Sequence, residues 1–316
     1  MQLSQLGEFG LIDLIRKRFS DIPSGPMLGI GDDCAVIPCD GQRSLVVTTD
    51  TMVEDIHFLR TAITPRLLGR KSLATNLSDV AAMGASPVAT FLSVALPRNV
   101  SAAWAEAFVE GYHSLSAEFG VPLLGGDTTS SAGAVVVSVT AVGRADNDTI
   151  KYRSSARPGD RIFVTGTLGD SARGLLDIKA GKTDTEFAAI HHDPSPRVRE
   201  GEWLGTRPEV HAMMDLSDGL ASDLVHILAA SGVAAEIELE SLPTRTSVEL
   251  AVTGGEDYEL LLTVEEGAAE RLNRAYGERF GVRLREMGRI ADGTPAIRWK
   301  RQGEEIAPDW HGFRHF

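Results

Sequence analysis

The spacing of apolar residues predicts three helices in the first 120 positions. The first covers residues 11–19. The second should begin after Thr64, a favourable N-cap, with Pro65 as its first residue, and should end at Gly84. The third is expected over 101–119, between a serine cap and a glycine stop. Polar caps and glycine stops therefore divide this half of the chain into well-marked elements.

The second predicted helix carries polar residues on one side. They lie three to four positions apart and so form one stripe: Ser72, Thr75, Asn76 and Asp79. Such a stripe could be a solvated face. We favour an inward face, because its neighbours are apolar and the Lys and Glu residues of an exposed face are missing after Lys71.

Short apolar runs bounded by turn residues predict strands. They lie at residues 45–47, 89–95, 122–124, 135–142, 161–165, 258–264 and 282–287. Further helices are expected over 170–180 and from about 219 to 230. The polar stretch 147–160 is the candidate boundary, so we predict two α/β domains, 1–148 and 149–316, rather than one doubly wound sheet.

Composition narrows the classes of partner. The 316 residues carry a net charge of −13, with 43% hydrophobic and 24% charged positions, which is typical of a folded globular protein. A field of this sign repels nucleic acid and anionic membranes, so neither is expected as a partner. It also opposes anionic substrates, which would need bound cations. The net charge alone does not distinguish a protein that binds anionic substrates through cations from an acidic protein that binds none.

The cysteines and the N-terminus indicate a cytoplasmic protein. Cys34 and Cys39 lack zinc-site spacing and form no disulfide framework, which favours a reducing compartment. Residues 1–8 lack the basic start and apolar stretch of a signal peptide. The most apolar run, 134–142, is too short to span a bilayer.

Aspartates recur where apolar runs end, in segments rich in Gly, Ser and Thr. They are Asp32, Asp33, Asp50, Asp79, Asp127, Asp215 and Asp218. Mg²⁺ takes oxygen ligands and is usually held by a few carboxylates together with substrate phosphates. The pattern therefore predicts a site for several Mg²⁺ ions that handles phosphates.

Several of these segments also have purely structural interpretations. The glycines at 166–169 and 125–126 could bring backbone N–H groups to a phosphate, or could form ordinary turns. Of Asp215 and Asp218, one is expected to cap the helix that follows. Glu256 and Asp257 could bind a cationic or hydrogen-bonding substrate group or lie in a solvated loop, and His57 could be a buried structural histidine or a pocket residue.

Taken together, the motifs resemble bacterial thiamine-monophosphate kinases. They occur in that family's order over nearly the whole chain: GIGDD (29–33), TTDT (48–51), NLSDVAAMG (76–84), GGDTT (125–129), VTGTLGDS (164–171), DLSDG (215–219), GGEDYEL (254–260) and DWHGF (309–313). The family belongs to an ATP-binding superfamily with aminoimidazole ribonucleotide synthetase, selenophosphate synthetase and the hydrogenase maturation dehydratase.

The resemblance implies a two-domain α/β (α+β), PurM-like fold. The N-terminal sheets of a homodimer would share a barrel, and the C-terminal domain would be an α/β sandwich. Residues matching metal positions are Asp33, Thr48, Thr49, Asp50, Asp79, Asp127, Asp215 and Asp218. ATP positions are matched by Gly126, Asp127, Arg144 and Ser217. Substrate positions are matched by His57, Glu256 and Phe313.

The implied reaction transfers a phosphoryl group from ATP to thiamine monophosphate, assisted by several Mg²⁺ ions, in the last step of thiamine diphosphate biosynthesis. Asp33, Asp50, Asp79, Asp127 and Asp215 would carry the catalysis. Two alternatives stay open: another ATP-dependent superfamily enzyme acting on a purine-pathway intermediate, and a non-catalytic nucleotide-binding protein. The chain lacks the reactive N-terminal Cys expected of selenophosphate synthetase and the C-terminal Cys expected of the hydrogenase enzyme.

Overall fold

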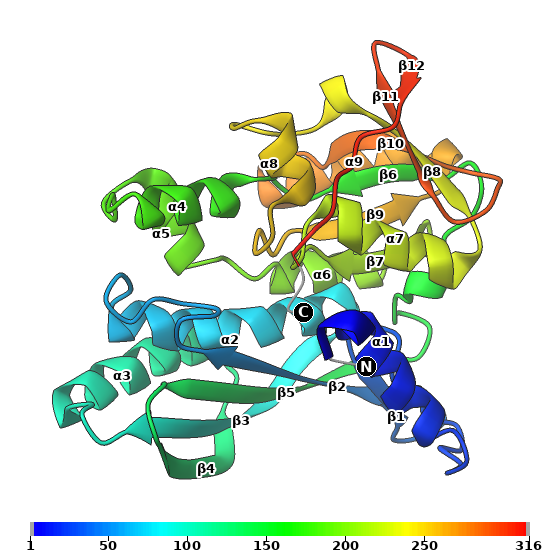
Figure 1. The fold of residues 1–316 in the computed structure, drawn as a ribbon. Coiled ribbons are helices and arrows are strands. Elements are labelled where there is room, and N and C mark those ends of the chain that lie inside the picture. The colour runs from blue at the N-terminus through cyan, green and yellow to red at the C-terminus, as the bar shows by residue number, and fades with distance from the viewer. Residues whose placement is uncertain (1–2, 314–316) are drawn as a thin grey trace.

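The computed structural model describes residues 3–313, which form two lobes, each built on one β-sheet (Figure 1). The helices are α1 (Leu3–Arg18), α2 (Pro65–Ala82), α3 (Ala102–Phe119), α4 (Asp170–Lys179), α5 (Glu186–His192), α6 (Val198–Gly205), α7 (Leu220–Ser231), α8 (Val248–Thr253) and α9 (Glu266–Phe280), with short 3₁₀ turns at Arg153–Ser155 and Leu239–Ser241. In this part of the chain no helix is long and apolar enough to cross a membrane.

The first lobe contains a five-stranded sheet in the order β1-β2-β5-β3-β4. Its strands are β1 (Ala35–Pro38), β2 (Arg43–Val53), β3 (Ser86–Pro97), β4 (Leu123–Ser131) and β5 (Val136–Asp146). The pairings are antiparallel except for β3 with β4, which are parallel. Alternate residues of β5 are buried and face α2, which leaves the opposite face of the sheet more open.

The second lobe contains a seven-stranded sheet in the order β12-β11-β8-β10-β6-β9-β7. Its strands are β6 (Arg161–Val164), β7 (Val210–Asp215), β8 (Ala234–Glu238), β9 (Leu260–Val264), β10 (Arg285–Ala291), β11 (Ile297–Arg301) and β12 (Glu304–Ile306). Every residue of β9 is buried, as expected for a strand covered on both faces. The mixed α/β class with two sheets is confirmed.

Helix α2 begins and ends where its sequence predicts. The Thr64 hydroxyl accepts a hydrogen bond from the N–H of Leu67 at 3.3 Å, and Pro65 is the first helical residue. Gly84 takes the left-handed conformation after the last turn, at φ 69°. The predicted inward direction of the polar stripe is also confirmed, because Ser72, Thr75 and Asn76 are buried.

Helix α2 lies between the two lobes and contacts both (Figure 1). On one side it packs on β2 and β5, and on the other on α6 and β7. One apolar cluster runs through this contact, joining Leu73 and Ala81 of α2 to Val198, Leu204 and Met213 of the second lobe. The two lobes therefore share one core.

The chain departs from the sequence-based expectation at two turns. Gly125 and Gly126 lie inside β4, where Gly126 pairs with Leu92. Its φ is 149°, and a Cβ atom there would lie 1.7 Å from the Leu92 carbonyl oxygen, so glycine is required for close strand pairing. In addition, α7 is capped by Gly219 rather than by either predicted aspartate. Asp223 accepts the N–H groups of Asp218 and Gly219 instead.

Candidate active site

A cavity of about 780 Å³ lies between the lobes. Residues from both contribute to its walls, among them β2 and α2 of the first lobe and α4, α5 and the 254–258 loop of the second. Most of the predicted site residues meet here: Thr49, Asp50, His57, Asp79, Asp215, Ser217, Asp218, Glu256 and Phe313. Residues that are widely separated in sequence thus line the same cavity.

Three carboxylates form a compact cluster at this cavity. Asp33, Asp79 and Asp215 each offer an oxygen, and these oxygens all lie within 4.8 Å of one another. Asp33 precedes β1, Asp79 lies on α2, and Asp215 ends β7, so three separate segments supply them. A set of close oxygen ligands matches what a hard divalent cation prefers.

Short hydrogen bonds orient the carboxylates. The Thr48 hydroxyl donates to Asp79 Oδ2 at 2.5 Å, and the Ser78 hydroxyl donates to Asp215 Oδ2 at 2.6 Å. Each hydroxyl contacts only one oxygen of its carboxyl group, so neither hydroxyl occupies the second oxygen. Thr48 thus contacts one carboxylate of the cluster, while Thr49 lines the cavity.

Asp50 reaches the same cavity from β2. Its backbone N–H donates to Asn76 Oδ1 at 3.2 Å, which ties the strand to the polar stripe of α2. Burial raises the pKa of the Asp50 carboxyl to about 6, although a hydrogen bond from Thr75 acts in the other direction. The stripe therefore fixes the position of a carboxylate as well as filling the contact between helix and sheet.

Burial makes the free carboxylates of the cluster hard to ionise. It raises the pKa of Asp215 to about 8, with repulsion from Asp33 as a further cause. Burial and repulsion from Asp50 also hold the pKa of Asp79 well above its usual range. Carboxyl groups buried this close together ionise more readily when positive charge offsets their repulsion, and a divalent cation would supply that charge. The donor set therefore fits Mg²⁺.

Arg153 is the one cation that touches the cluster within residues 3–313. Its Nη2 atom donates to Asp33 Oδ1 at 2.6 Å and its Nε atom to Asp33 Oδ2 at 3.3 Å. Its backbone N–H donates to Asp32 Oδ2 at 3.1 Å. Burial raises the pKa of Asp32 to about 7. Asp32 thus anchors the Arg153 backbone, outside the three-carboxylate cluster.

The residues matched to substrate contacts lie in the same cavity. His57 accepts a hydrogen bond at Nδ1 from the N–H of Val53 at 2.9 Å, so its proton is carried by Nε2. Glu256 lies in the left-handed region at φ 63° and is paired with Lys71, Nζ to Oε2 at 3.1 Å. Phe313, half-exposed, approaches from the C-terminal segment.

The glycine turn at 166–169 has an internal partner. The N–H groups of Gly169 and Ser171 donate to the two carboxylate oxygens of Asp257, at 2.7 and 3.1 Å. These amides at the start of α4 are therefore satisfied by Asp257 rather than turned towards a phosphate. The turn is structural, and Asp257 holds it to the neighbouring loop.

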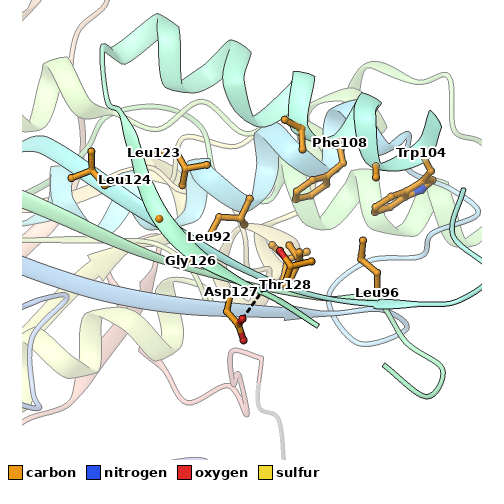
Figure 2. A pocket seen from close by; sticks show the side chains of 14 residues that line it. Leu92, Leu96, Trp104, Phe108, Leu123, Leu124, Gly126, Asp127 and Thr128 are labelled. Atoms are coloured by element: carbon orange, nitrogen blue, oxygen red, sulfur yellow. Dashed lines mark hydrogen bonds between the residues drawn. The ribbon is translucent and has the colours of Figure 1, made fainter. Parts of the chain in front are cut away.

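Three predicted residues lie apart from the cavity in the single chain. Asp127 and Gly126 are on the edge strand β4, separated from β2 by β3 and β5. Arg144 is exposed on β5, between two buried residues, and so faces away from α2. Figure 2 shows Asp127 pointing away from the apolar side chains of Leu92 and Phe108.

A second, more open cavity of about 550 Å³ lies beside the edge strand. It is lined mostly by apolar side chains from β3, β4 and α3, including Leu92, Leu96, Trp104, Phe108 and Leu124 (Figure 2). Its lining carries one carboxylate, Asp127, so it does not have the chemistry of the cavity between the lobes.

Sequence reasoning missed four residues that shape the site: Ser78, Arg153, Lys71 and His191. Ser78 lies in the NLSD motif and was passed over as part of the helix. Arg153 and His191 lie in polar segments without a distinctive pattern. Only their positions in three dimensions, beside Asp215, Asp33 and Glu256, give them a role.

Comparison with known proteins places this architecture in a defined class. Residues 31–145 match the N-terminal domain of AIR synthase related proteins, and residues 157–300 match the C-terminal domain of the same proteins. The chain therefore has the two-domain organisation of AIR synthase related proteins. The carboxylate cavity lies between the two matched regions.

The chain belongs to the thiamine-monophosphate kinase family. It is 38% identical over 333 aligned residues to the Escherichia coli K12 thiamine-monophosphate kinase, covering 98% of both chains. A solved structure described as AaThiL complexed with AMPPCP and TMP matches at a TM-score of 0.85 with 32% identity, covering 100% of this chain and 99% of the other. The thiamine monophosphate kinase of Aquifex aeolicus matches at a TM-score of 0.81 with 30% identity, covering 98% and 100%.

Proposed function

We propose that this protein phosphorylates thiamine monophosphate to thiamine diphosphate with ATP, the last step of thiamine diphosphate biosynthesis. One observation carries the proposal: a single cavity is lined by Asp79 and Asp215 of the three-carboxylate cluster together with His57, Glu256 and Phe313. The relatives that bear this activity in their names align over nearly the full length of the chain.

The chain's own carboxylates would hold Mg²⁺. Asp33, Asp79 and Asp215 form the core of the proposed ligand set, with Asp50 and Asp218 on the same cavity wall. When bound, the ions neutralise phosphate charge and favour in-line transfer between two anions. Titration of the protein with Mg²⁺ would measure how many ions bind at the same time.

The remaining residues position the acceptor. A phosphate monoester has a second pKa of about 6, so it is largely dianionic at neutral pH and needs no strong general base. Phe313 offers an aromatic face to a heterocyclic cation. His57 offers an N–H donor at Nε2, and Glu256 offers a carboxylate oxygen. The polar groups thus select the substrate, while the aspartates serve the transferred phosphate.

We also propose that the working unit is a homodimer with a barrel shared between the five-stranded sheets. Asp127 and Arg144 support this, because neither can reach its own cavity from the outer face of the sheet. A second copy packed on that face would bring them to a site, together with Gly126 and ATP. Ultracentrifugation tests this directly: a monomer that retains full turnover would contradict the proposal.

We place the enzyme in the cytoplasm as a soluble protein, with domains at 1–148 and 149–316. Both cysteines are free thiols, Cys34 buried and Cys39 exposed, which suits a reducing compartment. Cell fractionation followed by immunoblotting tests the location. Recovery with the membrane pellet after a salt wash would contradict it.

The activity test uses purified protein with ATP, Mg²⁺ and thiamine monophosphate, and follows thiamine diphosphate by chromatography. Product that forms with the native chain and is lost in Asp79→Asn supports both the reaction and the role of the cluster. ATP binding without product would overturn the kinase proposal and favour a non-catalytic nucleotide-binding protein or another superfamily reaction, which purine-pathway acceptors would then test.

A further inference from the structure

A buried lysine lies beneath the cavity wall that is formed by Glu256. Lys71 is on α2 and is 1% exposed, although it carries a charged ammonium group. Burying an unpaired charge is costly, so such a group needs partners. Its Nζ atom lies 3.1 Å from Glu256 Oε2 and 3.4 Å from His191 Nε2. These three residues come from α2, α5 and the 254–258 loop.

The protons of this cluster can be assigned from its contacts. An ammonium group is only a donor, so His191 Nε2 must accept from Lys71 and the ring proton lies on Nδ1. That Nδ1 atom is 2.9 Å from Ser171 Oγ and 3.4 Å from Glu256 Oε2. Burial and the charge on Lys71 lower the pKa of His191 to about 2, which keeps the ring neutral.

Both groups lie beside the same carboxylate oxygen, Lys71 within hydrogen-bond distance and His191 slightly farther away. Lys71 and His191 approach Oε2 of Glu256, while Oε1 has no hydrogen bond among residues 3–313. Glu256 lines the cavity, and its left-handed φ is held by its own N–H, which donates to the Ser217 carbonyl at 2.7 Å. One oxygen is thus anchored and the other is left for a ligand.

We propose that Lys71 and His191 are positioning residues that fix Glu256 so that Oε1 accepts a hydrogen bond from an N–H donor of the substrate. The inference rests on the proposed function and deepens it. Because Lys71 already balances the charge of Glu256, the pair is neutral as a whole. It therefore suits a neutral exocyclic amino group on an aromatic ring better than a cationic centre. The aminopyrimidine ring of thiamine monophosphate carries such a group.

The test compares steady-state kinetics of the wild type and Lys71→Met. We expect the KM for thiamine monophosphate to rise roughly tenfold or more, because a charge-assisted contact that orients Glu256 is lost. The KM for ATP and kcat should change little. An unchanged KM for thiamine monophosphate would overturn the inference.

Lys151→Met is the matched control. Lys151 is also buried, at 5% exposure, but its Nζ atom donates to the Arg207 carbonyl at 2.8 Å and not to Glu256. This variant should lose stability and keep its KM for thiamine monophosphate. If both lysine variants raise that KM equally, the effect is a general loss of packing and the positioning role is refuted.

A double-mutant cycle separates positioning from structure. If Lys71 acts through Glu256, Lys71→Met should add little to the KM effect of Glu256→Gln. Full additivity would show that Lys71 acts by another route. Should Lys71→Met fail to fold, His191→Gln replaces it in the same cycle, with the same expected outcome.

The two proposals can fail separately. If the wild-type protein forms no thiamine diphosphate, the proposed function fails. Calorimetric binding of thiamine monophosphate in the absence of ATP still reports on Glu256, and a weaker affinity in Lys71→Met would support the positioning role. Active wild-type enzyme with equal affinities for both proteins would overturn only the inference.

Discussion

Ser78 donates a 2.6 Å hydrogen bond to Asp215, and this bond joins the two lobes at the carboxylate cluster. Ser78 lies on α2 of the first lobe, whereas Asp215 ends β7 of the second, 137 positions later. Both side chains are buried. The position of one ligand of the proposed metal site therefore depends on how the lobes pack together.

Ser78→Ala should destabilise the protein by about 1–3 kcal/mol, the usual cost of leaving a buried acceptor without its donor. Denaturant unfolding in EDTA measures this change. Ser72→Ala is the control on the same helix, since the Ser72 hydroxyl donates to the nearby Gly69 carbonyl and not to the second lobe. Equal losses of stability in the two variants would show that the bond to Asp215 stabilises the protein no more than the local bond of Ser72 does.

Asp79→Asn should lower kcat roughly 100-fold or more while the fold is kept, because the amide is a poor ligand for Mg²⁺. Thermal unfolding should show that Mg²⁺ raises the wild-type Tm but leaves that of the variant unchanged. In EDTA the variant should unfold at or above the wild-type temperature, since one of three mutually repelling groups is gone. A variant with wild-type turnover at limiting Mg²⁺ would exclude Asp79 as a ligand.

Arg153→Met should destabilise the protein by about 3 kcal/mol or more, because Asp33 would lose its buried partner. The forked contact of Nε and Nη2 with both Asp33 oxygens explains why Arg153→Lys should restore only part of that stability. Chemical denaturation in EDTA reports the effect. Adding Asp33→Asn to Arg153→Met should recover stability, and a further loss instead would argue against this pairing.

Gly111→Ala should lower stability although alanine is the better helix former. Gly111 lies in α3 where α2 crosses closely, and a Cβ atom there would lie 1.8 Å from the Arg66 carbonyl oxygen. Gly267→Ala is the control, since Gly267 lies in α9 with open space around it. There the change should raise stability by up to about 1 kcal/mol. Thermal unfolding of both variants should give shifts of opposite sign, and a stabilised Gly111→Ala would contradict the close helix contact.

Stability should fall at acidic pH in part because of His191. Its pKa is about 2 in the folded protein against 6.5 for an unperturbed histidine. Below pH 6.5 the unfolded chain therefore takes up a proton that the folded chain refuses, so stability present above that pH is lost as pH falls. At pH 5 this amounts to about 2 kcal/mol.

Denaturant unfolding at pH 7.5 and pH 5 checks this prediction. The wild type should lose more stability between the two pH values than His191→Gln, by about 2 kcal/mol. Exposed His113, replaced by Gln, serves as the control and should follow the wild type. Equal losses in wild type and His191→Gln would show that the ring titrates normally in the folded protein.

The elements that could be predicted from sequence are those with local causes. Thr64 and Gly84 set the limits of α2 through hydrogen bonds and dihedral angles that involve only their neighbours. The expectation of a turn at Gly126 was wrong because that glycine serves a long-range pairing with Leu92. Local patterns cannot distinguish a glycine that turns the chain from one that admits a neighbouring strand.

The same distinction between local and long-range causes applies to the residues of the candidate site. Asp79 and Asp215 were identifiable from their motifs, and the structure brings them within reach of Asp33. Lys71 was noted only as the position after which this helix carries no further Lys or Glu. Its partners His191 and Glu256 lie 120 and 185 positions away, so no local pattern could reveal the cluster.

The shared core around α2 also has a consequence for folding during synthesis. Leu73 and Ala81 pack against Leu204, Met213 and other residues that leave the ribosome more than a hundred positions later. Until then the nascent first lobe must expose this apolar surface. A chain stopped at residue 148 would keep it exposed permanently, and so should aggregate or bind chaperones instead of folding into an independent domain.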